Sequence, residues 1–90
     1  MIAVHTRFTD APGRLELRPR HHELLAELHA EGVLVAAGPY ARGEGALILF
    51  DADRERVDRA LAADAYMQHP GVVITAIEEW DPVVGGVQRA

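Results

Sequence analysis

The chain has 90 residues, of which 49% are hydrophobic and 26% charged, and its formal net charge is −5. This length and composition predict a single ordered globular domain. The excess of acidic residues repels phosphate backbones and anionic lipid surfaces, so neither nucleic acid nor a membrane is expected as a partner.

The first eight residues alternate between two faces, which predicts a β-strand from Met1 to Phe8. Ile2 and Val4 lie on the face expected to cover helices. His5 lies on the opposite face, where it would be at a dimer interface, at the mouth of a pocket or simply in solvent. Residues 10 to 13, with the sequence DAPG, predict a turn after this strand.

The first helix is predicted to begin at Pro19, which suits the first helical position, and to end at Gly32. Leu17, His21 and Leu28 fall on one stripe at helical spacing, so His21 is expected to face the core. Burial and a place in the first turn would both favour the neutral imidazole, which can accept a proton. A lone histidine that fills a half-buried position and bonds to the backbone is the alternative.

The central part of the chain predicts two strands joined by a short hairpin connection. Residues 33 to 37 form a nearly continuous apolar run, typical of a buried strand, and Gly38 and Pro39 are expected to stop it. Residues 41 to 45 form the connection, and Ala46 to Phe50 the next strand.

The second helix is predicted to start after an N-cap at Asp51 or Asp53 and to run to about Asp64. Val57 and Leu61 form an apolar stripe whose next member is Asp64. The two helices would therefore each place a titratable side chain toward the core, a histidine and an aspartate, which form a natural acid/base pair. Asp64 could equally be the N-cap of the turn that follows.

Residues 65 to 71 are predicted to form a turn that presents Tyr66 and His69. The last strand is expected from Val72 to Trp80, with Val73, Thr75 and Ile77 on one face. The complete order is β-α-β-β-α-β, the split βαβ arrangement of a ferredoxin-like α+β domain with an antiparallel sheet.

The sequence contains no Cys, Ser, Lys or Asn, which excludes disulfides, thiolate metal sites, serine or cysteine acyl-enzymes and Schiff bases. A zinc helix of the H-E-x-x-H type is also excluded, because Ala26 stands where the second histidine would be. We therefore expect no metal and no cofactor. No signal peptide or long apolar run is recognisable, which makes the cytoplasm the expected location.

Four short segments, in this order and spacing, resemble landmarks of the YCII-related (YciI-like) domain family. The resemblance covers residues 1 to 81 and leaves 82 to 90 as a C-terminal tail. Ala65 departs from the family pattern, which has proline there, and this would loosen the turn that holds Asp64. The segments are Arg18-Pro19-Arg20-His21, His29-Ala30-Glu31-Gly32, Ala37-Gly38-Pro39 and Asp64-Ala65-Tyr66.

The resemblance implies a ferredoxin-like domain that dimerises sheet to sheet into an α/β barrel, with an active site built around His21 and Asp64. Arg18 is a candidate for binding a substrate carboxylate or phenolate, unless it merely lies on the surface. Gly38 and Pro39 would let a ligand approach the backbone, and Tyr66 would present its hydroxyl to the pocket.

Two functions from different classes are compatible with this sequence. The first is a small-molecule enzyme in which Asp64 orients and polarises His21, and His21 moves a proton in an elimination, isomerisation or dehydrohalogenation. The second is a non-catalytic dimeric module that binds a metabolite or a partner, because this fold supports both.

Overall fold

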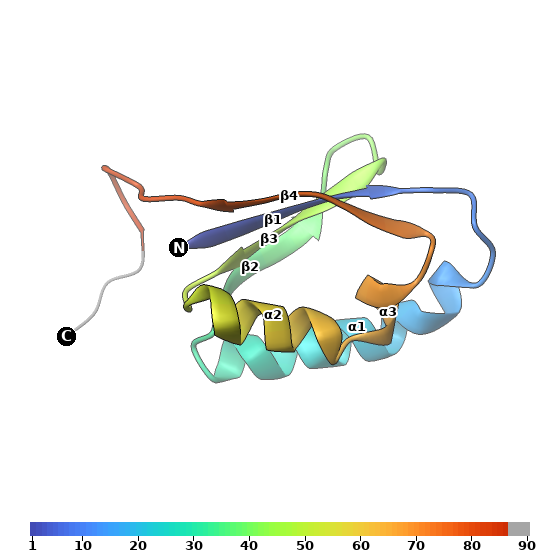
Figure 1. Ribbon diagram of the computed structural model, residues 1–90, viewed down its shortest axis with the longest axis horizontal. Coiled ribbons are helices and arrows are strands. Elements are labelled where there is room, and N and C mark those ends of the chain that lie inside the picture. Colours follow the sequence, from blue (N-terminus) through green and yellow to red (C-terminus); the bar gives the residue numbers. More distant parts are fainter. Residues whose placement is uncertain (87–90) are drawn as a thin grey trace.

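The computed structural model describes residues 1 to 86, which form one four-stranded antiparallel sheet and three helices (Figure 1). The strand order in the sheet is β2-β3-β1-β4. Together with the order of the elements along the chain, this confirms the predicted ferredoxin-like α+β fold. The elements are β1 (Ile2–Phe8), α1 (Arg14–Ala30), β2 (Leu34–Pro39), β3 (Gly45–Phe50), α2 (Arg54–Ala62), α3 (Ala65–Gln68) and β4 (Val72–Glu79).

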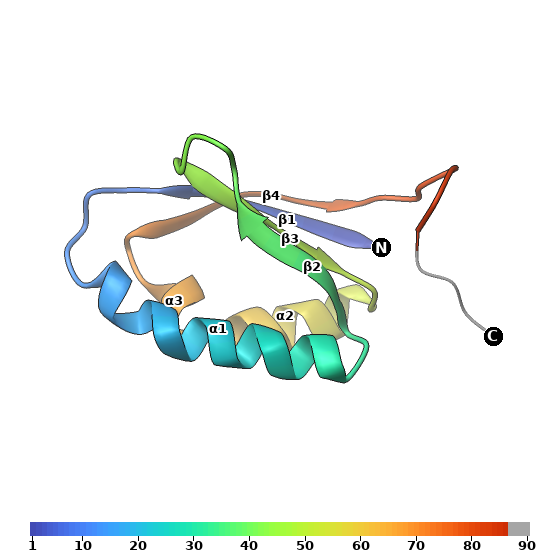
Figure 2. The same cartoon turned by 180° about the vertical axis from the view of Figure 1, so that it is seen from behind.

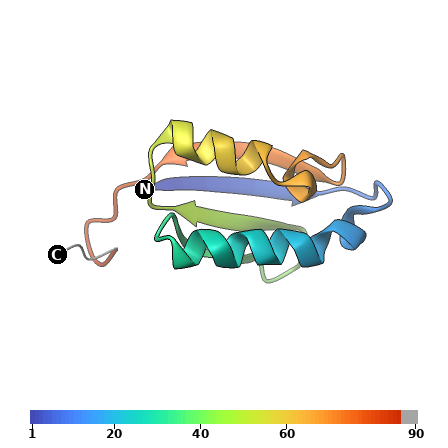
Figure 3. The ribbon, with the colours of Figure 1, turned by 90° about the horizontal axis from the view of Figure 1, so that it is seen from below.

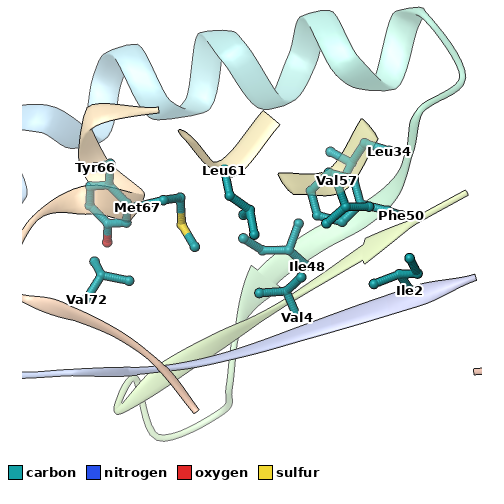
Figure 4. Close-up of a cluster of buried hydrophobic side chains, with 10 residues drawn as sticks. All are labelled: Ile2, Val4, Leu34, Ile48, Phe50, Val57, Leu61, Tyr66, Met67 and Val72. Atoms are coloured by element: carbon teal, nitrogen blue, oxygen red, sulfur yellow. The ribbon is translucent and has the colours of Figure 1, made fainter. Parts of the chain in front are cut away.

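The molecule has two layers. Helices α1 and α2 lie side by side on one face of the sheet, and within residues 1 to 86 no helix covers the other face (Figures 2 and 3). The hydrophobic core fills the space between the layers, where Phe50, Val4 and Val57 are the largest fully buried side chains (Figure 4). No helix in this part of the chain combines the length and hydrophobicity needed to cross a bilayer.

Helix α1 begins at Arg14 and not at Pro19, so the proline lies inside it. Gly13, whose φ is 96°, provides the N-cap in a left-handed conformation that glycine adopts without steric cost. The guanidinium of Arg14 lies 4.0 Å from the centre of the Phe8 ring, and its Nη1 donates a 2.6 Å hydrogen bond to the Tyr66 hydroxyl. These tertiary contacts stabilise the first turn of α1. The preference of proline for the first helical position had predicted a later start.

The earlier start changes the position of His21 in its helix. His21 lies two turns inside α1, beyond the first turn in which the helix dipole acts, so the predicted effect of that dipole on the imidazole does not apply. Its burial, by contrast, is confirmed: only 7% of the residue is exposed. Gly32, with a φ of 78°, follows the end of the helix as predicted.

Replacement of Pro19 by alanine should stabilise the protein. Proline has no N–H to donate to the Leu15 carbonyl one turn earlier, and its ring crowds that carbonyl. Because Pro19 is exposed, alanine would restore the hydrogen bond without disturbing the core. We expect the free energy of unfolding, measured in urea, to rise by about 1 to 2 kcal/mol. The gain is limited because alanine also makes the unfolded chain more flexible, which favours unfolding. Pro12→Ala, outside the helix, should give no such gain, and an equal effect of both substitutions would contradict this explanation.

Strand β2 lies at the edge of the sheet and continues through Gly38 and Pro39, which were predicted to stop it. Pro39 is the last residue of the strand and pairs with Ala46. An edge strand tolerates proline because it lacks a neighbour on one side. Residues 36 to 39 are exposed, so the prediction of a buried strand is wrong for residues 36 and 37. The predicted hairpin connection to β3 is present.

Strand β4 contains a β-bulge that breaks the predicted alternation of its faces. The register between β1 and β4 shifts next to His5, and the Thr75 hydroxyl donates a 3.2 Å hydrogen bond to the His5 carbonyl. Because of the extra residue, Ile74 and Ile77 both pack against the core. The predicted common face of Val73, Thr75 and Ile77 is therefore wrong.

Helix α2 starts after an N-cap at Asp53, one of the two predicted positions, but ends at Ala62. The segment predicted as a turn from 65 to 71 begins with the short helix α3. Of the predicted tail, residues 82 to 86 have no regular secondary structure, and residues 87 to 90 lie outside the described part of the chain.

Candidate active site

The His21 and Asp64 side chains form a buried pair, as predicted from their stripe positions. The Nδ1 atom of His21 is hydrogen-bonded to the Oδ2 atom of Asp64. His21 comes from the middle of α1, and Asp64 from the junction between α2 and α3. The pair therefore joins segments that are far apart in the sequence and fixes the imidazole relative to the second helical segment.

Asp64 fills both of the roles that its sequence position allowed. Its Oδ1 atom accepts a 3.0 Å hydrogen bond from the Tyr66 backbone N–H and so caps α3, while Oδ2 bonds to His21. Ala65 occupies the first helical position of α3, and the N-cap is formed without the expected proline. Both carboxylate oxygens are thus engaged, and the backbone of α3 sets the direction in which Oδ2 points.

Tyr66 holds the imidazole from its face. Its ring stacks on the His21 ring, with 4.3 Å between the ring centres and 19° between the ring planes. The Tyr66 hydroxyl is in turn fixed by the hydrogen bond from Arg14. The imidazole is therefore held at one edge by Asp64 and on one face by Tyr66, which limits its rotation.

The second ring nitrogen of His21 remains available for a ligand. Nε2 has no hydrogen-bond partner among residues 1 to 86. In the same part of the chain, every fully buried side-chain nitrogen or oxygen has a hydrogen-bond partner. Nε2, which has none, is therefore not fully buried. Because His21 lines a pocket, we infer that its Nε2 atom opens into that pocket.

The pocket has a volume of about 350 Å³ and lies between α1 and the end of the sheet formed by β2 and β3. The four candidate substrate-binding residues, Arg18, Gly38, Pro39 and Tyr66, all line it together with His21. Asp64 does not line it and reaches it only through the imidazole. Tyr40, the other tyrosine of the chain, does not line this pocket, and its hydroxyl is hydrogen-bonded to His5, 2.7 Å from Nδ1.

The family model of the YCII-related domain matches residues 1 to 81. The chain belongs to the YCII-related family. No curated protein and no solved structure gives a significant match to it. These comparisons assign no ligand and no activity to this YCII-related domain.

The pocket of this YCII-related domain also contains side chains that the sequence did not point to, among them Phe8, Arg14, His22 and Leu25. Three of these four lie on α1, at spacings that place them on the same side as Arg18. A helix predicted to start directly after the DAPG turn would have placed these residues on the side of Arg18. The prediction that the helix begins at Pro19 instead left Arg14 outside it.

The remaining histidines of the YCII-related domain do not extend the site into a metal centre. Residues 1 to 86 contain no group of three or more His, Asp or Glu side chains placed to bind a metal. His69 accepts a 2.9 Å hydrogen bond from the Gly71 backbone N–H and closes the turn before β4. The titratable side chains on the pocket wall are two imidazoles, a phenol and two guanidinium groups, from His21, His22, Tyr66, Arg14 and Arg18.

Proposed function

We propose that this YCII-related domain is a small-molecule enzyme in which His21 transfers a proton and Asp64 orients and polarises it. One observation supports this above all: the carboxylate holds Nδ1 of a buried imidazole, while Nε2 opens into a pocket. A general base needs this combination of a fixed direction and an accessible lone pair.

The proposed steps use only these two side chains. The carboxylate of Asp64 accepts the hydrogen on Nδ1, which leaves the lone pair of the neutral imidazole on Nε2. Nε2 removes a proton from a carbon atom of the ligand, and Asp64 stabilises the resulting imidazolium. The electron pair of the broken C–H bond forms a double bond as halide leaves, or as a hydroxyl group takes the proton from the imidazolium and leaves as water; alternatively, the proton returns to another carbon. These outcomes are dehydrohalogenation, elimination and isomerisation.

The proton-transfer step can be tested before the natural substrate is known. All three reactions begin with removal of a proton from carbon, so the protein should catalyse exchange of that proton with D₂O in suitable ligands. A panel of small carbonyl compounds and halogenated phenols, followed by NMR, would detect protein-dependent incorporation of deuterium. Exchange that persists without the His21 imidazole would contradict the proposal.

A non-catalytic binding module is the second candidate, and the apolar part of the pocket supports it. Leu25, Pro39 and Ile48 line the pocket beside the polar groups and could hold a metabolite without chemistry. The two candidates differ in what His21→Asn does. A binding module would keep most of its ligand affinity and show no exchange in either form, whereas the enzyme would lose rate.

We also propose that the protein is a homodimer that pairs through the helix-free face of the sheet. In the register of β1 and β3, Leu47 is opposite His5 and Leu49 is opposite Ala3, all on the face away from the helices. Val73 on β4 is exposed on the same side. An antiparallel sheet with apolar residues on this face needs a cover, and a second copy would provide one.

Leu49→Glu should convert this dimer into a monomer, because it places a charge in the centre of the proposed interface. Sedimentation velocity at micromolar concentration would measure the change. Leu15→Glu is the matched control, since Leu15 is 57% exposed on α1 and lies away from the sheet face; it should leave the dimer intact. A monomeric wild-type protein would overturn the proposed assembly.

A further inference from the structure

We propose that the ligand of the pocket is a small organic carboxylate, whose carboxylate group is bound by Arg14 and Arg18. This inference rests on the proposed function insofar as both place the ligand at the same pocket. It concerns the class of compound that binds, and it can be tested by binding alone.

The charge of the pocket wall is opposite to that of the whole chain. The chain has a formal charge of −5, yet the pocket is lined by Arg14, Arg18, His21 and His22 and by no acidic residue. The nearest carboxylate identified in the site, that of Asp64, is already engaged by His21 and the α3 backbone. A ligand in this pocket therefore meets guanidinium groups without competing protein carboxylates on the wall.

Four of the arginines outside the pocket have acidic partners, whereas Arg7 and Arg42, also outside it, have none among residues 1 to 86. Arg20 hydrogen-bonds to Glu23 at 2.9 Å, and this bond together with the charge of Glu27 raises the pKa of Arg20. Arg54, Arg56 and Arg59 are likewise paired with acids. Arg14 and Arg18 have no acidic partner among residues 1 to 86. Two unpaired guanidinium groups at one pocket indicate an anionic ligand.

The two arginines have complementary properties. Arg14 is half-buried and held by Phe8 and the Tyr66 hydroxyl, so its guanidinium is ordered before the ligand arrives. Its hydrogen bond to Tyr66 uses one nitrogen and leaves further N–H donors free. Arg18 follows one turn later on α1 and is exposed. Arg14 thus provides a donor held in place by its neighbours, and Arg18 adds an exposed guanidinium at the same pocket.

The size and the remaining wall of the pocket indicate a compact organic acid. A volume of about 350 Å³ lies near the lower end of the range for small-molecule sites, which is about 300 to 1,000 Å³. Leu25, Pro39 and Ile48 offer an apolar surface to the body of the ligand. Guanidinium groups match the planar geometry of a carboxylate, with two parallel hydrogen bonds.

Benzoate and benzamide provide a matched pair of probes, because they have nearly the same shape and differ in charge. We expect benzoate to shift the NMR signals of pocket residues saturably and to bind at least about tenfold more tightly than benzamide, as a charge-assisted contact predicts. Arg18→Gln should weaken benzoate binding by about tenfold and leave benzamide binding unchanged. Arg54→Gln, which removes an arginine from the outer face of α2, should affect neither.

Arg14→Lys is the second variant, because it retains the charge but loses the planar fork; it should also weaken benzoate binding. Equal affinities for benzoate and benzamide, unchanged benzoate affinity in both arginine variants, or no saturable benzoate binding would overturn the inference. Benzoate binding with no proton exchange on any ligand would instead refute the proposed enzyme and support the anion site. Proton exchange on neutral compounds without benzoate binding would refute the anion site and support the proposed enzyme.

Discussion

His21→Asn should reduce protein-dependent proton exchange by about 10²- to 10⁴-fold, which is the usual contribution of a positioned general acid or base. The asparagine amide can still donate a hydrogen bond to Asp64, so the buried carboxylate keeps a partner. No basic lone pair remains at the position of Nε2, however, and the ligand proton has no acceptor. The rate of deuterium incorporation, measured by NMR on wild type and variant, tests this expectation.

His29→Asn is the matched control for that experiment. It makes the same substitution on the same helix, but His29 is exposed and does not line the pocket beside His21. We expect its exchange rate to equal that of the wild type. A His21→Asn variant that exchanges protons as fast as the His29→Asn control would exclude His21 as the base.

Asp64→Ala should lower the free energy of unfolding by about 2 to 4 kcal/mol. Removal of the carboxylate leaves the buried Nδ1 of His21 without its partner, at a cost of about 1 to 3 kcal/mol. It also removes the N-cap of α3, which contributes about 0.5 to 2 kcal/mol more. Urea denaturation followed by circular dichroism measures the change.

Two further variants separate these contributions. Asp53 caps α2 by accepting a 2.8 Å hydrogen bond from the Arg56 N–H and has no buried histidine as partner, so Asp53→Ala measures the loss of a cap alone. Asp64→Asn retains a side chain that can cap α3. We expect Asp64→Ala to lower the free energy of unfolding more than either Asp53→Ala or Asp64→Asn. If Asp53→Ala costs as much as Asp64→Ala, the contact with His21 contributes nothing to stability.

Hydrophobic periodicity predicted the order of the four strands and of the two longer helices α1 and α2, but not the short helix α3. It also predicted that His21 and Asp64 face the core, because each falls on an apolar stripe, although Asp64 lies beyond the end of α2. Their contact followed from the two-layer packing of a ferredoxin-like domain. These features depend on spacing within one element, which a single sequence displays directly.

The errors arose where contacts between distant segments override local preference. Arg14 extends α1 beyond the limit that Pro19 suggested, because it contacts Phe8 and a tyrosine 52 residues later in the sequence. The bulge in β4 is likewise a property of the pairing with β1 and leaves no mark in the alternation of residues. The same long-range contacts bring Arg14 into the pocket, and for that reason it was missed as a site residue.

The two hydrogen bonds of the Asp64 carboxylate restrict which amino acids position 64 can tolerate. Serine and threonine cap helices well, but each has a single side-chain oxygen and cannot also hold the imidazole. Glutamate has both oxygens on a longer side chain and is not among the preferred capping residues. Asparagine can cap α3 through its single acceptor oxygen, but its amide can then donate to Nδ1 of His21 only when the imidazole proton lies on Nε2, which removes the lone pair that the proposed base needs. Of these residues, only aspartate accepts from the backbone of α3 and also from an imidazole that carries its proton on Nδ1, so position 64 has little freedom to vary without loss of the cap or of the Nε2 lone pair.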